Sequence, residues 1–250
     1  MNRFVVYGNG CAAQSLTQLL CEKGKFVSVV SPSHKEIQKA IRANFEAKLE
    51  NTTEFLFPDD LKYEIIAVDK LMKKITFNDK LTSAKGQCEM VFEIFDDELS
   101  NKMSAIREAR EVFPNSIIAS HTESLAYRSI FEKFSHDPKV VGAHFVRPIE
   151  NSRIIEVVQG KNTSRETMTS LLDLAKSLNV QMIQCNDQKG LIANRLIAQF
   201  LRESQDLINT QGCSPQDFDA IFQSVFGTTS TLQQMQKGLG QDVLKNIATS

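Results

Sequence analysis

A strand, a glycine-rich turn, a helix and a second strand follow one another at the start of the chain. This order constrains the fold more than any other feature. Residues 3–7 predict a strand through the apolar stretch at 4–7, and a Gly-Asn-Gly turn ends it at residues 8–10. Leucines at helical spacing follow, and residues 26–30 form an unbroken run typical of strands buried on both faces. The order therefore predicts a parallel α/β sheet.

The glycine turn has the features that a dinucleotide pyrophosphate requires. Gly8 permits the tight turn, and Gly10 lets phosphates approach the backbone N–H groups at the helix N-terminus. Ala13 replaces the third glycine of such turns, at the point where helix and strand pack closely. We therefore predict NAD or NADP as cofactor. The alternative is a turn that only packs a Rossmann-like sheet.

The end of the second strand lacks the acidic residue that usually binds the adenine ribose of NAD. Ser31 stands there, and it can still exchange a hydrogen bond with a ribose hydroxyl. A serine does not repel a 2′-phosphate, which His34 or Lys35 could contact. The sequence therefore leaves the choice between NAD and NADP open.

Strand and helix patterns continue to alternate as far as residue 185. Further strands are expected at 75–77, 90–95, 116–120, 140–144, 154–159 and 180–185, and further helices at 33–50, 97–112 and 164–178. Beyond Gly190 only helical patterns recur: one long helix at 191–209, then another opened by Ser214 with proline at its first position. We predict an α/β fold: a Rossmann-like, doubly wound, mostly parallel sheet over residues 1–186, with a smaller all-α domain at 187–250.

Composition excludes several classes of protein. The 29 Lys and Arg residues nearly balance the 30 Asp and Glu residues, which argues against a nucleic-acid partner. No apolar run is long enough for a membrane helix, and the start of the chain does not read as a secretory signal. The five cysteines show no metal-ligand spacing, so we expect reduced thiols, no bound metal and a cytoplasmic protein.

One further motif lies around His144. The run His-Phe-Val-Arg-Pro begins at His144, and Glu156 follows twelve residues after that histidine. Residues 190–196 read Gly-Leu-Ile-Ala-Asn-Arg-Leu at the start of the long helix, and Phe-Glu-Ile at residues 92–94 precedes Lys102. In this order, these motifs resemble those of the 3-hydroxyacyl-CoA dehydrogenases over almost the whole chain.

The resemblance implies roles for several side chains. His144 would be the general acid/base, oriented by Glu156, and Asn194 would hold the substrate oxygen near it. An imidazole with an unperturbed pKa of about 6.5 suits proton transfer near neutral pH. Predicted cofactor contacts are Gly8, Gly10, Ala13, Ser31, Glu93, Asp97 and Lys102. Predicted substrate contacts are Ser120 and Arg147.

Two positions depart from the family pattern. The family has Ser-Asn-Thr-Ser-Ser where this chain has Ser-His-Thr-Glu-Ser at 120–124, so Glu123 replaces a functional serine. The hydroxyl of Ser124 could take the place of the missing one if the loop shifts by one position. Arg147 replaces an asparagine. One hypothesis pairs Glu123 with Arg147, and another lets Arg147 bind a substrate carboxylate. Both positions are counted among the candidate site residues, and both place ordinary activity in doubt.

The sequence thus predicts an NAD(P)-dependent oxidoreductase that interconverts a 3-hydroxyacyl thioester, linked to CoA or a carrier, and its 3-oxoacyl form. We expect a homodimer through the C-terminal helices, in a helical domain shorter than in the family. The alternative is a catalytically impaired, dinucleotide-binding regulatory or scaffold protein. The β-hydroxyacid dehydrogenases rank lower, because glycine occupies position 190, where they carry a lysine.

Overall fold

The computed structural model describes residues 3–50, 67–84 and 86–248. The chain divides into two compact units. The first comprises Met1–Thr122 and Tyr127–Gln184, and the second comprises Glu123–Ala126 and Cys185–Ser250. The second unit thus includes a four-residue segment that a linear division of the sequence assigns to the first.

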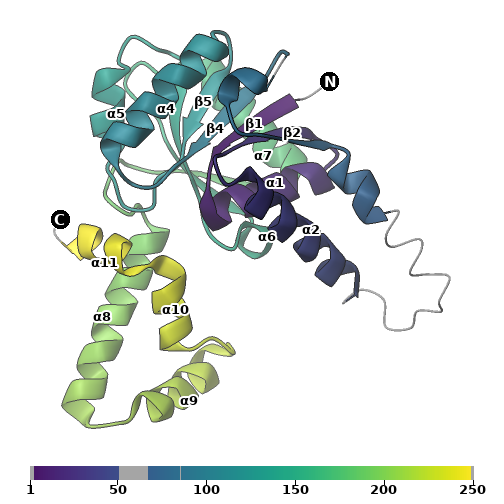
Figure 1. Ribbon diagram of the computed structural model, residues 1–250. Coiled ribbons are helices and arrows are strands. Elements are labelled where there is room, and N and C mark those ends of the chain that lie inside the picture. The colour runs from purple at the N-terminus through teal and green to yellow at the C-terminus, as the bar shows by residue number, and fades with distance from the viewer. Residues whose placement is uncertain (1–2, 51–66, 85, 249–250) are drawn as a thin grey trace, which may run out of the picture. The chain divides into compact units, whose positions relative to one another are not determined.

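The first unit is built on one eight-stranded sheet with the order β3-β2-β1-β4-β5-β6-β7-β8. Figure 1 labels four of its neighbouring strands, β2, β1, β4 and β5. Its strands are β1 (Arg3–Gly8), β2 (Phe26–Val30), β3 (Ile75–Asn78), β4 (Met90–Ile94), β5 (Ile117–Ser120), β6 (Val140–Phe145), β7 (Ile154–Val158) and β8 (Gln181–Gln184). All neighbours are parallel except β6 and β7, which are antiparallel. The predicted doubly wound, mostly parallel sheet is confirmed.

Helices cover the sheet because its strands are apolar on both faces. The helices of this unit include α1 (Gly10–Glu22), α2 (His34–Glu50), α4 (Leu99–Val112), α5 (Arg128–Lys133), α6 (Ile149–Ser152) and α7 (Arg165–Leu178), with a 3-10 turn at Leu81–Ser83. Residues 67–72 are also helical. One buried cluster joins α1, α2 and α7 to alternate strand residues such as Phe4 and Phe92. Val5 and Val91 point to the opposite face, as successive strand residues do, and are equally buried.

The element boundaries differ from the sequence expectation in a few places. The short helices α5 and α6 and the 3-10 turn have patterns too brief to predict. The long helix begins at Ala193, later than expected, because Gly190 and Leu191 have φ angles of 71° and 46°, in the left-handed region. The helix expected from residue 97 begins at Leu99.

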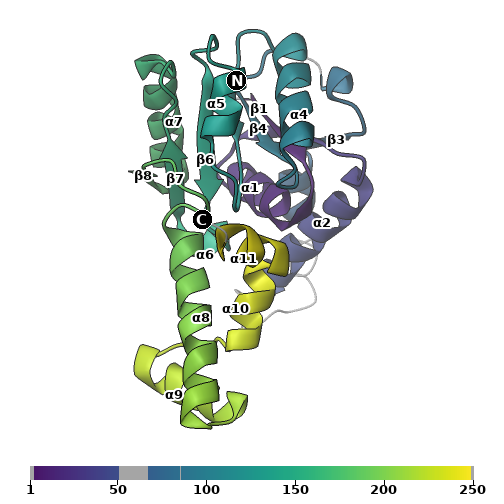
Figure 2. The ribbon, with the colours of Figure 1, turned by 90° about the vertical axis from the view of Figure 1, so that its left-hand side faces the viewer.

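The second unit is helical, as predicted (Figure 2). Its helices are α8 (Ala193–Gln211), α9 (Pro215–Phe226), α10 (Leu232–Leu239) and α11 (Gln241–Ala248). The Ser214 side chain accepts the N–H of Asp217, which confirms the predicted cap of α9. Ala198, Leu239 and Ile247 form a small core between α8, α10 and α11.

Two features are absent from the described part of the chain. No helix there has both the length and the apolar character needed to cross a membrane. No group of three or more His, Cys, Asp or Glu side chains there is arranged to hold a metal ion.

Candidate active site

The candidate acid–base pair lies in the first unit, on the antiparallel strands β6 and β7. His144 and Glu156 are register partners, and His144 Nδ1 lies 2.7 Å from Glu156 Oε2. Both residues are 2% exposed. The carboxylate accepts the Nδ1 proton, so the ring's Nε2 carries the lone pair that can take a proton. The structure thus brings together the two side chains that the resemblance to the family linked.

A second histidine, which the sequence reasoning did not count as a site residue, stacks on the first. The His121 and His144 rings have centroids 5.4 Å apart and an interplanar angle of 23°. The N–H of Phe145 donates to His121 Nδ1 at 3.3 Å, so that nitrogen carries no proton. The one available signal was that histidine replaces the asparagine of the family pattern at position 121.

A buried ion pair ties the ends of β4 and β5 together. Lys102 Nζ donates to Glu93 Oε1 at 3.2 Å, to the Phe95 carbonyl at 2.8 Å and to the carbonyl of His121. Ser120 Oγ donates to Glu93 Oε2 at 2.5 Å. Glu93, Lys102 and Ser120 are fully buried, so they fix the loops at this edge. Direct contact of these three residues with cofactor or substrate stays a prediction, as it does for Asp97, whose carboxylate lies 3.9 Å from Lys102 Nζ.

The glycine turn joins β1 to α1 at the same edge. A Cβ on Gly8 would lie 2.0 Å from the carbonyl oxygen of Ile94, so only glycine fits there. Gly10 has a φ of 76°, and a Cβ there would meet no described atom within 4 Å. No side chain caps α1 at Asn9, and its first turn carries no acidic residue. The turn therefore offers an open helix N-terminus to an anion, which fits a dinucleotide pyrophosphate.

Two further predicted cofactor residues, Ala13 and Ser31, are fully buried. Ala13 is fully buried in the cluster that packs α1 on the sheet, where a larger side chain would separate the two. Ser31 is also fully buried, and its hydroxyl accepts the N–H of Ser33 at 3.2 Å. Ser31 therefore shapes the loop after β2, and its own contact with the cofactor remains a prediction.

In the second unit, Asn194 lies at the start of α8 and is bonded to Glu123. Its Nδ2 donates to the Glu123 carbonyl and to Glu123 Oε2, each at 2.8 Å. Asn246 Nδ2 donates to Ser124 Oγ at 3.1 Å. Glu123, which stands where the family has a serine, thus accepts hydrogen bonds from Asn194, the residue expected to hold the substrate oxygen.

Arg147 lies in the turn after β6 and is half-buried. Both hypotheses for it, the ion pair with Glu123 and the binding of a substrate carboxylate, stay predictions.

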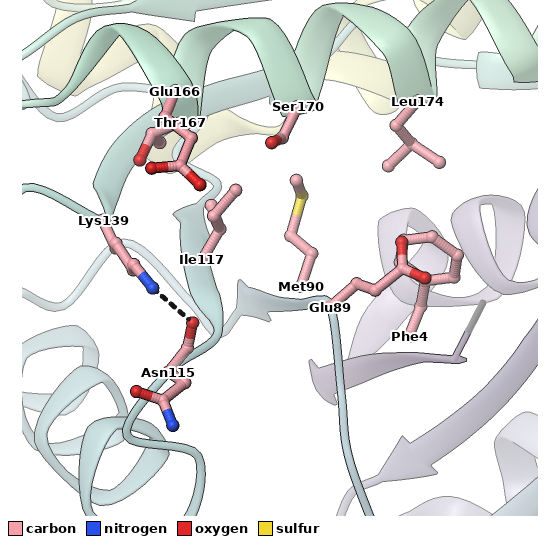
Figure 3. A pocket seen from close by; sticks show the side chains of 10 residues that line it. All are labelled: Phe4, Glu89, Met90, Asn115, Ile117, Lys139, Glu166, Thr167, Ser170 and Leu174. Carbon is pink, nitrogen blue, oxygen red and sulfur yellow. Dashed lines mark hydrogen bonds between the residues drawn. The ribbon is translucent and has the colours of Figure 1, made fainter. Parts of the chain in front are cut away.

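A pocket of about 220 Å³ lies at the amino ends of the strands, opposite the ends that carry the glycine turn (Figure 3). Figure 3 shows Met90 and Ile117, at the amino ends of their strands, facing Ser170 and Leu174 of α7. Ligands of doubly wound sheets bind at the carboxyl ends of the strands. This pocket is therefore not the dinucleotide site.

Comparisons with known proteins identify the family of this chain. The family model described as the NAD-binding domain of 3-hydroxyacyl-CoA dehydrogenase matches residues 3–188. The human mitochondrial hydroxyacyl-coenzyme A dehydrogenase is 25% identical over 243 residues, which cover 97% of this chain and 77% of that protein.

Solved structures show the same fold. FadB2 of M. tuberculosis superposes with a TM-score of 0.85 at 20% identity, over 100% of this chain and 86% of that one. The (S)-3-hydroxybutyryl-CoA dehydrogenase PaaH1 of Ralstonia eutropha gives 0.79 at 17% identity, over 100% and 89%. The family match, the glycine turn and the order of the motifs lead to one conclusion: this chain belongs to the 3-hydroxyacyl-CoA dehydrogenase family of NAD(P)-dependent oxidoreductases.

Proposed function

We propose that this protein interconverts a 3-hydroxyacyl thioester and its 3-oxoacyl form, with His144 as the general acid/base. The observation that carries the proposal is the buried hydrogen bond between His144 Nδ1 and Glu156 Oε2, near the carboxyl end of β6. Family membership supplies the substrate class, and a thioester of CoA or of a carrier both fit it.

A dinucleotide held at the glycine turn of Gly8 and Gly10 would supply the hydride acceptor, so that in the oxidative direction it would take up the hydride released when the C3–H bond of the substrate breaks. The hydroxyl proton passes to His144 Nε2 as the carbonyl forms. The imidazole becomes an imidazolium, whose positive charge is stabilised by Glu156. In the reductive direction, the same proton returns to the oxygen. Because Nδ1 is already bonded to the carboxylate, Nε2 is the nitrogen that exchanges the substrate proton. The same bond holds the ring in one orientation.

The stack of His121 on His144 supports this assignment. A ring that is pinned in its plane by Glu156 and covered on one face by His121 has little freedom to rotate. General bases act best when they are held in the productive geometry before the substrate arrives. His121 is therefore a positioning residue in this proposal.

The cofactor residues of the proposal are the glycine turn and the residues that shape the neighbouring loops. Gly8 and Gly10 present the start of α1 to the pyrophosphate, and Ala13 keeps the helix close to the sheet. Glu93 and Lys102 hold the β4 and β5 loops. NAD or NADP is the cofactor.

One observation favours the second candidate, a dinucleotide-binding regulatory or scaffold protein with impaired catalysis. The amide of Asn194 donates twice to Glu123, so both of its N–H bonds are used within the protein. A carboxylate near a developing alkoxide is also repulsive. The acid–base pair nevertheless keeps the geometry that the reaction needs, so we rank the enzyme first.

A homodimer through the C-terminal helices is also part of the proposal. Leu196 of α8 and Ile221, Val225 and Phe226 of α9 are 60% to 69% exposed. Exposed apolar side chains of this size are typical of surfaces that a partner covers. We place the protein in the cytoplasm, in keeping with cysteines that form no disulfide in the structure.

Acetoacetyl-CoA with NADH or NADPH tests the proposal most directly, by the loss of absorbance of the reduced cofactor. We expect turnover with wild-type protein and a loss of at least about 100-fold in His144→Gln. Cofactor binding without turnover of any acyl thioester would instead support the scaffold.

A further inference from the structure

We propose that the carboxyl ends of β2 and β3 bind the 2′-phosphate of NADP(H), so that this chain binds NADP(H) in preference to NAD(H). The inference rests on the proposed function, because it concerns the cofactor of the same site. It depends on residues of the first unit alone.

The location follows from the sheet register. Tyr7, which precedes the glycine turn, pairs with Val30 at the end of β2, and Val30 pairs with Asn78 at the end of β3. The residues that follow β2 therefore lie next to the glycine turn. In dinucleotide-binding sheets this edge receives the adenine ribose, whose 2′ position distinguishes the two cofactors.

The loop after β2 lacks the carboxylate that selects NAD. Ser31 is fully buried, and its hydroxyl is occupied by the N–H of Ser33. Ser33 and His34 are half-buried, and Lys35 is exposed. The loop therefore presents a hydroxyl, an imidazole and an ammonium group where an NAD site presents a negative charge. All three suit a phosphate.

Asn78 provides a second, independent observation. The Ser31 N–H donates to the Asn78 carbonyl at 3.0 Å, which places Asn78 beside this loop. Its side-chain Nδ2 is buried, and it has no hydrogen-bond partner among the described residues. A buried amide without an acceptor is unfavourable, and native structures rarely leave one. A phosphate or ribose oxygen would supply the missing acceptor.

Basic and acidic side chains both lie near the ends of β2 and β3, but no acidic one occupies the position that selects NAD. His34 and Lys35 lie in the first turn of α2, where the helix dipole also favours an anion, and Lys80 follows β3. Glu36 and Asp79 are the acidic residues near them, and both are exposed. Neither takes the position at the end of β2 from which a carboxylate holds the ribose of NAD.

Binding of two cofactor fragments tests the proposal without any turnover. Adenosine 2′,5′-bisphosphate and AMP differ only by the 2′-phosphate, and calorimetry can measure the Kd of each for the full chain. We expect the bisphosphate to bind at least about tenfold more tightly, and NADPH to bind more tightly than NADH by a similar factor. Equal affinities, or tighter binding of AMP and NADH, overturn the proposal.

Variants identify the residues responsible. Lys35→Ala and Ser33→Asp should each weaken bisphosphate binding by about tenfold while AMP binding, which also reports the folded state, stays unchanged. Lys23→Ala is the matched control, because Lys23 is an exposed lysine that precedes β2 at its opposite end. If Lys35→Ala and Lys23→Ala lower bisphosphate affinity equally, the effect is general charge and the proposed site is wrong.

The outcome also separates this inference from the proposed function. If NADH binds more tightly than NADPH and thioester turnover is observed, only the 2′-phosphate proposal fails. If neither cofactor nor either fragment binds, the proposed function fails and the 2′-phosphate site with it.

Discussion

His144 and Glu156 face each other across the only antiparallel strand pair of the described sheet, with Nδ1 and Oε2 2.7 Å apart. Opposite residues of such a pair place their side chains on the same face, close enough to bond. The short helix α6 (Ile149–Ser152) connects the two strands, which accounts for the twelve-residue spacing. The pair is thus a product of the strand register.

Glu156→Gln should lower kcat by about 100-fold with little change in KM, because glutamine cannot stabilise the imidazolium that forms on His144. Kinetics with acetoacetyl-CoA measure this. The control is Glu111→Gln, which neutralises an exposed glutamate at the end of α4. A near-normal kcat in Glu156→Gln would show that the carboxylate does not assist proton transfer.

Glu123→Ser should raise kcat/KM by about tenfold, since it removes a negative charge and releases one of the two N–H bonds of Asn194. The backbone acceptor of Asn194 remains in this variant. Glu203→Ser, at an exposed position of α8, controls for the loss of a glutamate. Unchanged or lower activity would mean that Glu123 itself contributes to the site of this protein.

The two glycines of the turn should respond differently to alanine. Gly8→Ala places a Cβ 2.0 Å from the Ile94 carbonyl, so we expect a loss of stability of about 3 kcal/mol or more. Gly10→Ala meets no described atom and carries only the strain of its φ of 76°, about 1 kcal/mol. The second variant should stay folded yet bind cofactor more weakly. Urea unfolding and cofactor titration give both quantities, and equal stability losses would contradict this difference.

Removing one partner of the buried Glu93–Lys102 ion pair should lower the free energy of unfolding more than removing both charges. Lys102→Met leaves the Glu93 carboxylate buried without its cation, which we expect to destabilise the fold by about 3 to 5 kcal/mol. Adding Glu93→Gln should restore part of that loss, because the buried charge is then gone. Denaturant midpoints of Lys102→Met, of Glu93→Gln and of the double variant measure the coupling, and strictly additive losses would refute it.

Stability should fall in alkaline solution through Cys21. Burial raises the pKa of this thiol from 9.0 to about 11, so between these values the unfolded chain releases the proton while the folded one keeps it. The free energy of unfolding therefore decreases as pH rises from about 9 to about 11, by about 1 to 2 kcal/mol for this group. Burial and a bond to Glu108 raise the pKa of Tyr7 in the same direction.

The Cys21→Ala variant separates this contribution from that of other groups. Its stability disadvantage relative to wild type, measured by urea unfolding, should shrink over the same pH range. A disadvantage that stays constant from pH 8 to pH 11 would show that the thiol titrates alike in both states.

The sequence by itself determined the sheet and the helical second unit, and its resemblance to the family predicted that His144 and Glu156 act together. Strand and helix patterns are local, and the glycine turn at residues 8–10 depends on neighbours in the chain. The pairing of His144 with Glu156 was implied by the resemblance to the family, and the register of the consecutive strands β6 and β7 brings the two side chains together.

The tertiary structure decided what depends on groups far apart in the chain. The stack of His121 on His144, the donation of Asn194 to Glu123 and the buried amide of Asn78 beside Ser31 each join residues 23 to 71 positions apart. No pattern in the sequence encodes such contacts, because they arise only when the packing of strands and helices brings those side chains to one place.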